Sequence, residues 1–154
     1  MEVKTKINAE EGKQDLTITR EFDLPLNLLF KAYSEAELVE QWMGTNVLKF
    51  DNKKHGSYQF ETKHQGNVVF RANGVIHEFI PNQKITRTFE METVSFGVQL
   101  EIHQFEKITE NTSKIIIHTI FETVAVRDQM LKLPFKQGIN MAHNRLQEIV
   151  TNLK

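Results

Sequence analysis

The feature that most constrains this chain is a long region, from about Val47 to Val124, in which the sequence pattern changes to period two. Four of its segments are 57–64, 67–80, 84–92 and 96–105, and a fifth, 114–124, is a dense β-branched run typical of a central strand. Alternation of this kind is typical of β-strands that bury one face. The connections are short, whereas parallel strands need crossovers of about a dozen residues or more, so the pattern predicts an antiparallel meander.

Within three of these segments the pattern carries further detail. Each alternating set marks one face of its strand. Gly74 interrupts the longest segment, where we expect a bend or bulge. The alternating positions of the next two segments are Ile85, Arg87, Phe89 and Met91, then Phe96, Val98, Leu100 and Ile102.

A strand and two short helices are predicted before the meander. Residues 15–22 alternate as a half-buried strand does. Residues 24–33 carry apolar side chains at helical spacing. Ser34 and Glu37 form a capping-box pattern, which predicts that a second helix begins there and runs to about residue 42.

The chain ends in a long amphipathic segment. Pro134 either starts this helix or kinks a longer one. Gly138 costs a helix about 1 kcal/mol relative to alanine, and close packing of the helix on the sheet would explain it. The order of strand, two helices, about six antiparallel strands and a long helix indicates an α+β domain. The apolar stripe comprises Phe135, Gly138, Ala142, Leu146, Ile149, Val150 and Leu153.

Length and composition restrict the class of protein. The 154 residues suit a single domain, 1–154, that buries a core without staples. The net charge of −1 gives no electrostatic reason to bind nucleic acid or an anionic membrane. Cysteine is absent, which excludes disulfides, a thiolate nucleophile and Cys-type zinc sites. The N-terminus shows no signal-peptide pattern, and no apolar run is long enough to span a membrane, so we expect a cytoplasmic protein.

Three segments in order resemble the START-like (SRPBCC) superfamily, in the branch named after the activator of Hsp90 ATPase. They are "ITREFDLPLNLLFKAYSEAELVEQWMG", "NGVIHEFIPNQKITRTFEME" and "VRDQMLKLPFKQGINMAHNRLQEIV". The chain departs from the branch pattern at Trp42-Met43-Gly44-Thr45, where a proline usually follows the glycine, at His55-Gly56, and at Pro134 and Phe135.

The resemblance implies the helix-grip fold of START and Bet v 1-like proteins. In that fold a curved antiparallel sheet of about six to seven strands wraps around a long C-terminal helix, with two short helices after the first strand. It also implies a cavity between sheet and helix, of a few hundred Å³ if it binds a ligand. Members of the superfamily bind small molecules, catalyse cyclisations or dock on a chaperone, so fold does not decide function.

Six aromatic or methionine side chains are candidates for lining that cavity. Such residues suit an adaptable apolar ligand site, and they suit a plain core equally well. They are Trp42, Tyr58, Phe60, Phe70, Phe89 and Met130.

His77 and Glu78 are the first polar candidates. Neighbours on a regular strand point to opposite faces, so the two side chains pair only across a bulge. Glu78 lies between Ile76 and Ile80 and so shares an apolar parity. It would be a polar anchor or general acid/base in the cavity, or a structural partner of an arginine, Arg87 or Arg127.

Arg127 and Asp128 are the second polar candidates. Asp128 would cap a helix. Arg127 would tether the chain locally, close the cavity mouth or bind a ligand carboxylate. The six histidines lack metal-ligand spacing, so we expect no metal and no cofactor.

Three functions follow as hypotheses. The first is binding of a small apolar or amphipathic molecule by a monomer or weak homodimer, with no catalytic site evident. The second is docking on a chaperone, as related Hsp90 activators do. The third is a hydrolase or cyclase acting on the bound ligand, which requires His77 or Glu78 to face the cavity; no nucleophile elbow or phosphate loop supports enzymatic chemistry.

Overall fold

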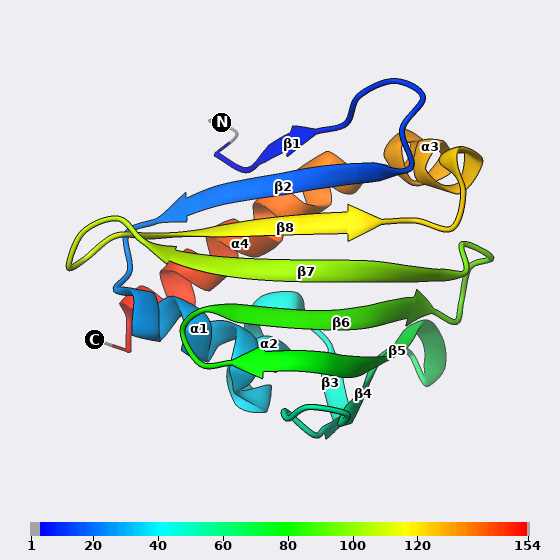
Figure 1. The fold of residues 1–154 in the computed structure, drawn as a ribbon. Coiled ribbons are helices and arrows are strands. Elements are labelled where there is room, and N and C mark those ends of the chain that lie inside the picture. The colour runs from blue at the N-terminus through cyan, green and yellow to red at the C-terminus, as the bar shows by residue number, and fades with distance from the viewer. Residues whose placement is uncertain (1–3, 154) are drawn as a thin grey trace.

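The computed structural model describes residues 4–153, so both ends of the expected 1–154 domain lie outside the described residues. Within that range eight strands form one antiparallel sheet in the order β1-β2-β8-β7-β6-β5-β4-β3 (Figure 1). The strands are β1 (Lys6–Asn8), β2 (Asp15–Phe22), β3 (Asn46–Phe50), β4 (Ser57–His64), β5 (Asn67–Ile80), β6 (Lys84–Met91), β7 (Val98–Lys107) and β8 (Ser113–Ile120). The predicted meander runs from β4 to β8. The short strands β1 and β3 raise the count above the expected six to seven.

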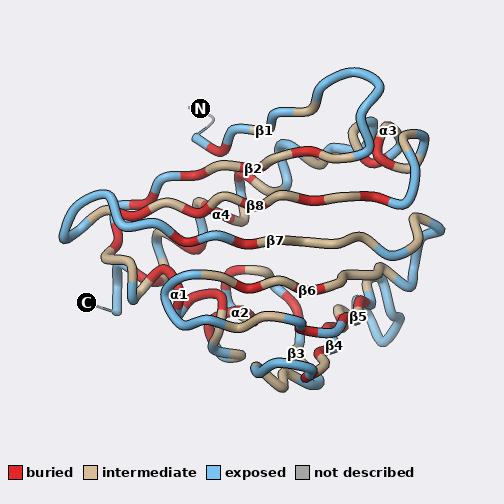
Figure 2. The backbone as a smooth tube through the Cα atoms, viewed as in Figure 1, coloured by how far each residue is buried: buried red, intermediate tan, exposed pale blue. Residues whose placement is uncertain are grey.

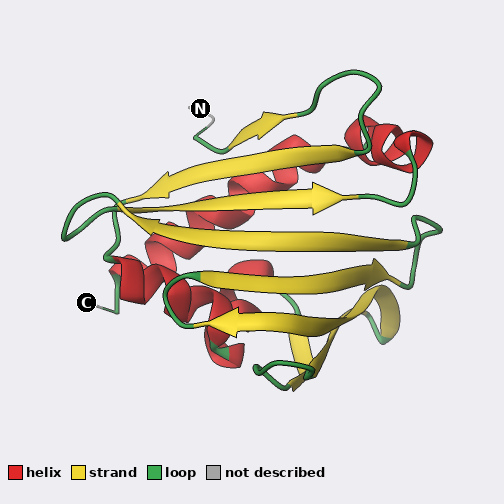
Figure 3. Ribbon diagram, viewed as in Figure 1, coloured by secondary structure: helices red, strands yellow, loops and turns green. Residues whose placement is uncertain are grey.

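All helices of the described chain lie on one side of the sheet or at its edge (Figure 3). The long helix α4 crosses behind β2, β8 and β7 in this view, while α1 and α2 cover the other half of the same face. The α+β, helix-grip expectation is therefore confirmed. The helices are α1 (Leu26–Ser34), α2 (Ala36–Met43), α3 (Val124–Lys132) and α4 (Phe135–Thr151).

β2, the first long strand of the chain, pairs with β8, the last strand. β2 and β8 are in register over eight residue pairs, with Ile18 opposite Ile117. Alternate residues of both strands are buried against the helices, as the banding along β2 and β8 in Figure 2 shows. The period-two pattern in the sequence thus arises because one face of the sheet is covered by helices and the other is open to solvent.

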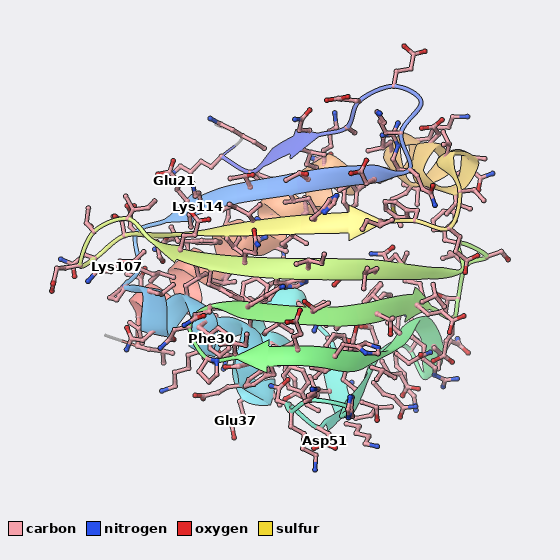
Figure 4. The ribbon with its side chains drawn as sticks, in the orientation of Figure 1. Glu21, Phe30, Glu37, Asp51, Lys107 and Lys114 are labelled. Atoms are coloured by element: carbon pink, nitrogen blue, oxygen red, sulfur yellow. The ribbon has the colours of Figure 1, made fainter. Side chains whose placement is uncertain are left out.

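Aromatic rings hold α1 against the sheet. Phe30 contacts Phe105 and Phe79 with ring centroids 4.9 and 5.5 Å apart. Figure 4 shows Phe30 over α1 beside the sheet, whereas the labelled charged side chains lie at strand ends and turns and on α2.

Among residues 4–153, no helix has both the length and the apolar character needed to cross a bilayer.

Two capping predictions are wrong. Ser34 is the last residue of α1 rather than the cap of α2, and the capping position between the two helices is Glu35. Asp128 lies inside α3, which Thr123 caps by accepting a hydrogen bond from the Val126 amide at 3.1 Å. The α2 boundary is one residue from the predicted cap, whereas α3 begins well before Asp128, at Val124.

Near residue 120 the chain also departs from the predicted strand. β8 ends at Ile120, so residues 121–123 connect to α3, which begins at Val124, instead of continuing the strand. Pro134 separates α3 from α4, which confirms the first alternative, that it starts the last helix.

Gly74 permits a close crossing of the Tyr58 side chain over β5. The two residues are opposite each other in the β4–β5 pair, and the Tyr58 hydroxyl donates to the Thr88 carbonyl of β6. A Cβ at position 74 would overlap both that carbonyl oxygen and the Tyr58 ring. The ladder keeps its register here, so the expected bulge at Gly74 is wrong; the register shift lies between Ile76 and Glu78.

We predict opposite effects for the same substitution at two glycines. Gly74→Ala should lower the free energy of unfolding by about 3 kcal/mol, because a methyl group is forced into an occupied space. Gly138→Ala should raise it by about 1 kcal/mol, because α4 gains helix propensity and a Cβ there meets no atom within 4 Å. Denaturant unfolding of both variants checks the signs. A neutral Gly74→Ala variant would contradict the close crossing.

Candidate functional site

A cavity of about 440 Å³ lies between the sheet and α4. Its walls come from β2, β5, β6, β7 and β8 on one side and from all four helices on the other. The cavity expected between sheet and helix is therefore present. Gly138, where we expected close packing, instead faces open space at its margin.

Apolar side chains form most of the cavity wall. Alternation along β6 turns Phe89 and Met91 inward, and the helical period of α4 aligns Phe135, Ile139 and Ala142 along the opposite side. The predicted candidates that line the cavity are Trp42, Phe70, Phe89 and Met130.

Four polar side chains on β6 and β7, hereafter the polar floor, also face the cavity: Arg87, Gln99, Glu101 and His103. Arg87 and Glu101 are opposite each other in the β6–β7 pair, and the arginine Nε donates to Glu101 Oε1 at 3.3 Å. The same oxygen lies 3.0 Å from His103 Nε2, and Gln99 Nε2 donates to Oε2 at 2.8 Å. Three donors thus converge on one carboxylate whose side chain is only 13% exposed.

The polar floor sets the charge states of its members. Burial alone would raise the pKa of Glu101, but the His103 hydrogen bond and the Arg87 charge lower it to about 2. Burial lowers the pKa of His103, and the neighbouring Arg87 charge adds to that effect while Glu101 opposes it. The floor therefore holds a carboxylate, a guanidinium and a neutral imidazole near pH 7.

A second polar cluster, hereafter the α4 anchor, ties the last helix to Thr5 just before β1, to β2 and to α1. His143 Nδ1 is 2.8 Å from Thr5 Oγ1, and its Nε2 is 3.2 Å from the Tyr33 hydroxyl. Arg20 Nη1 donates to Thr5 Oγ1 at 3.0 Å, and the Thr5 amide donates to Asn140 Oδ1 at 3.1 Å. Every member is buried, so the cluster fixes both the position and the rotation of α4.

Tyr58 and Phe60 do not line the cavity. They are buried in a separate core cluster with Val39 and Ile76, under α2. This is the plain-core alternative that the sequence left open for these aromatic residues.

His77 and Glu78 also lie away from the cavity. The β5 bulge after Ile76 adds one residue to the strand, so Phe79 rather than Glu78 turns toward the core. The inward parity expected for Glu78 is therefore wrong beyond the bulge. His77 is exposed, and Glu78 accepts hydrogen bonds from Thr86 and Lys84, not from either predicted arginine.

Arg127 has a tethering position. Its Nη1 donates to the carbonyl oxygens of Glu10 and Asp15, and its Nη2 pairs with Asp128 at 3.0 Å. These bonds join α3 to the β1–β2 connection. Arg127 is buried there and does not border the cavity.

The polar floor is the part of the site that the sequence analysis missed. One signal was available, because Arg87 shares its parity with Ile85 and Phe89. In β7 the apolar set that includes Leu100 and Ile102 marks the outward face, and His103 and Phe105 are the buried ones. Within the described chain, no three acidic or histidine side chains are grouped as metal ligands.

Comparisons with known proteins agree with this architecture. The model of the family described as "Activator of Hsp90 ATPase homolog 1-like protein" matches residues 23–151. No curated protein matches the chain in sequence.

Among solved structures, the chain is similar to a protein from Rhodobacter sphaeroides, with a TM-score of 0.83 and 17% identity over 96% of this chain and 99% of that one. For a Mycobacterium smegmatis protein the TM-score is 0.82 and the identity 16%, over 94% of this chain and 95% of that one. For a Staphylococcus epidermidis protein the TM-score is 0.78 and the identity 21%, over 94% of each chain. At these identities the likeness shows the fold.

The α4 anchor should make stability depend on pH. Burial, with the nearby Arg20 charge, lowers the pKa of His143 from 6.5 to about 3. Between those values the unfolded chain binds a proton that the folded chain excludes, so stability falls as pH falls. We predict that wild type loses about 2 kcal/mol between pH 7 and pH 5 through this residue.

Denaturant unfolding at both pH values checks this prediction. The difference between them should shrink by about 2 kcal/mol in His143→Gln, whatever that variant's stability at pH 7. The exposed His64 offers a control, since His64→Gln should leave the difference unchanged. An equal loss in His143→Gln and wild type would rule out His143 as the source.

Proposed function

The chain belongs to the activator of Hsp90 ATPase homolog 1-like family, and from that premise we propose that it binds a small, largely apolar molecule in the cavity between the sheet and α4. The observation that carries the proposal is the cavity itself, about 440 Å³ in volume. Ligand sites usually measure about 300–1,000 Å³ and combine apolar walls with a few convergent polar groups. This cavity has both.

Binding would draw on two kinds of interaction. The aromatic and methionine walls would remove apolar ligand surface from water, which contributes about 25 cal/mol per Å². The polar floor would orient the ligand, because its groups are held by one another and need no rearrangement. Phe70, Phe89 and Met130 are the wall residues that we expect to contact the ligand.

Access to the cavity is from the side of α4. Gly138 and Arg145 border the cavity and are also exposed to solvent, so we define them as the cavity mouth. The missing side chain at Gly138 keeps this mouth wide. A ligand would enter here, along the side of α4 between Gly138 and Arg145.

Docking on a chaperone is the second function that the family description suggests. It requires a protein-binding surface instead of an accessible cavity, so it predicts no response to small molecules and retention of a chaperone on the immobilised protein. The third hypothesis required His77 or Glu78 in the cavity. Because both lie outside it, the structure leaves that hypothesis without its named residues.

We predict that one class of apolar ligand stabilises the protein and alters its fluorescence. Trp42 is the single tryptophan of the chain and lines the cavity, so its emission reports on cavity binding. The panel should contain lipids, flavonoids, polyketide-like aromatics and sterols. A ligand at about 100 times its Kd stabilises by about 2.7 kcal/mol, which raises Tm by roughly 5–10 °C in a domain of this size.

Gly138→Phe should abolish the response by filling the mouth. Gln137→Phe is the matched control, because it adds the same ring to the exposed neighbour outside the cavity lining. Loss of binding in the first variant alone supports the proposal. A flat response of wild type across the panel, or equal binding by both variants, contradicts it.

A further inference from the structure

The terminal nitrogens of Arg87 are hydrogen-bond donors without an acceptor among residues 4–153. A guanidinium carries five N–H donors, and the structure uses only the one on Nε, toward Glu101. The guanidinium also lies over the Tyr58 ring, 4.6 Å from its centroid. Among residues 4–153, Nη1 and Nη2 donate to nothing, although Arg87 is only 8% exposed.

These nitrogens are open to the cavity. Across the described residues, Nδ1 of His103 is the one side-chain nitrogen or oxygen that has neither solvent-accessible surface nor a hydrogen-bond partner. Nη1 and Nη2 of Arg87 are unpaired too, so they must retain accessible surface, and the space that Arg87 borders is the cavity. Unpaired donors in a buried setting are uncommon, because each costs free energy until an acceptor reaches it.

The charged side chains that line the cavity give it a net positive charge, the same sign as the Arg87 guanidinium. Arg87 and Arg145 bring two positive charges to the cavity, and Glu101 brings one negative charge. His103 and His143 are buried and neutral. Arg145 donates from Nε to the Trp42 carbonyl at 3.0 Å and has no carboxylate partner among the described residues. The cavity therefore carries one positive charge in excess.

We propose that the ligand of this cavity is an amphipathic monoanion, and that Arg87 binds its carboxylate through Nη1 and Nη2. The inference rests on the proposed function and names the chemical class of its ligand. A guanidinium offers two parallel N–H bonds that match the two oxygens of a carboxylate. Glu101 occupies the Nε position and leaves the terminal nitrogens free for this contact.

The apolar part of the ligand then lies along the cavity wall. With the carboxylate on the polar floor, the hydrocarbon extends toward Phe89, Met130 and Ile139 and the mouth. Arg145 at the mouth adds long-range attraction for the same charge, without contacting the bound carboxylate. A neutral carbonyl would satisfy the Arg87 donors but leave the excess charge uncompensated.

The test compares ligands that differ only in the head group. Dodecanoate, dodecanol and dodecylamine are titrated against wild type at pH 7 while Trp42 fluorescence and Tm are recorded, the two charged probes below their critical micelle concentrations and dodecanol below its solubility limit. We expect dodecanoate to bind about tenfold or more tighter than dodecanol, as charge-assisted hydrogen bonds allow, and dodecylamine to bind weakest.

The key variant is the double substitution Arg87→Leu with Glu101→Leu. Removing both charges avoids leaving a buried carboxylate unpaired, and replacing a buried ion pair by apolar residues is usually tolerated. In this variant the preference for dodecanoate over dodecanol should disappear while dodecanol still binds. Arg145→Gln should weaken dodecanoate binding about threefold at low salt, because it removes long-range attraction; it also removes the hydrogen bond to the Trp42 carbonyl, so binding of dodecanol to the same variant is the reference. Lys136→Gln, an exposed charge on the same helix outside the lining, should change nothing.

Each other outcome identifies which proposal fails. If wild type binds dodecanol as tightly as dodecanoate, the carboxylate inference is overturned and the proposed function stands. If the double variant keeps the preference for dodecanoate, Arg87 is not the contact. If no probe changes Trp42 emission or Tm, and the wider ligand panel is equally silent, the proposed function itself is contradicted.

Discussion

The site depends on how α4 is held against the sheet. Leu146 and Val150 in the second half of the helix are fully buried, so that half packs tightly. Phe135, Gly138 and Ile139 in the first half line the cavity instead. Between them the α4 anchor fixes the helix through His143 and Asn140, with bonds to Thr5 near the start of the chain. The helix therefore keeps a defined position although part of its surface borders the cavity.

The polar floor is difficult to explain as a stabilising feature. Moving Arg87 and Glu101 out of water costs free energy that their mutual attraction repays only when every donor and acceptor is satisfied. Here Nη1 and Nη2 of Arg87 and Nδ1 of His103 remain unpaired among the described residues. An apolar set at these positions would fill the core at lower cost. The arrangement is consistent with groups kept for a ligand, which is the basis of the anionic class proposed above.

The family and the fold restrict the function without determining it. Structures from three bacterial species share the fold with 16–21% identity, a level at which pocket residues are free to differ. The helix-grip shell is determined by backbone pairing and by a few large buried residues such as Phe22 and Phe60. Side chains on the concave face of β6 and β7 can change without disturbing that pairing, so ligand chemistry must be argued from them.

Much of the fold could be predicted from the sequence because it follows from local periodicity. The strands from 57 to 120, the amphipathic last helix and the break at Pro134 are each encoded in adjacent residues and short turns. The candidate site could be predicted only in part. Trp42, Phe70, Phe89 and Met130 were identified as candidates, whereas the polar floor was not, since its members are scattered over two strands and become neighbours only through the β6–β7 register.

By itself the sequence determined the α+β class, the order of the elements and which segments bury one face, because a side chain's direction repeats every two residues in a strand and every 3.6 in a helix. Tertiary structure alone decided which face of β7 is covered, where the bulge in β5 moves Glu78 outward, and that a cavity remains beneath α4. These features depend on the pairing of distant strands and on space left unfilled. Neither is a property of any short stretch of residues.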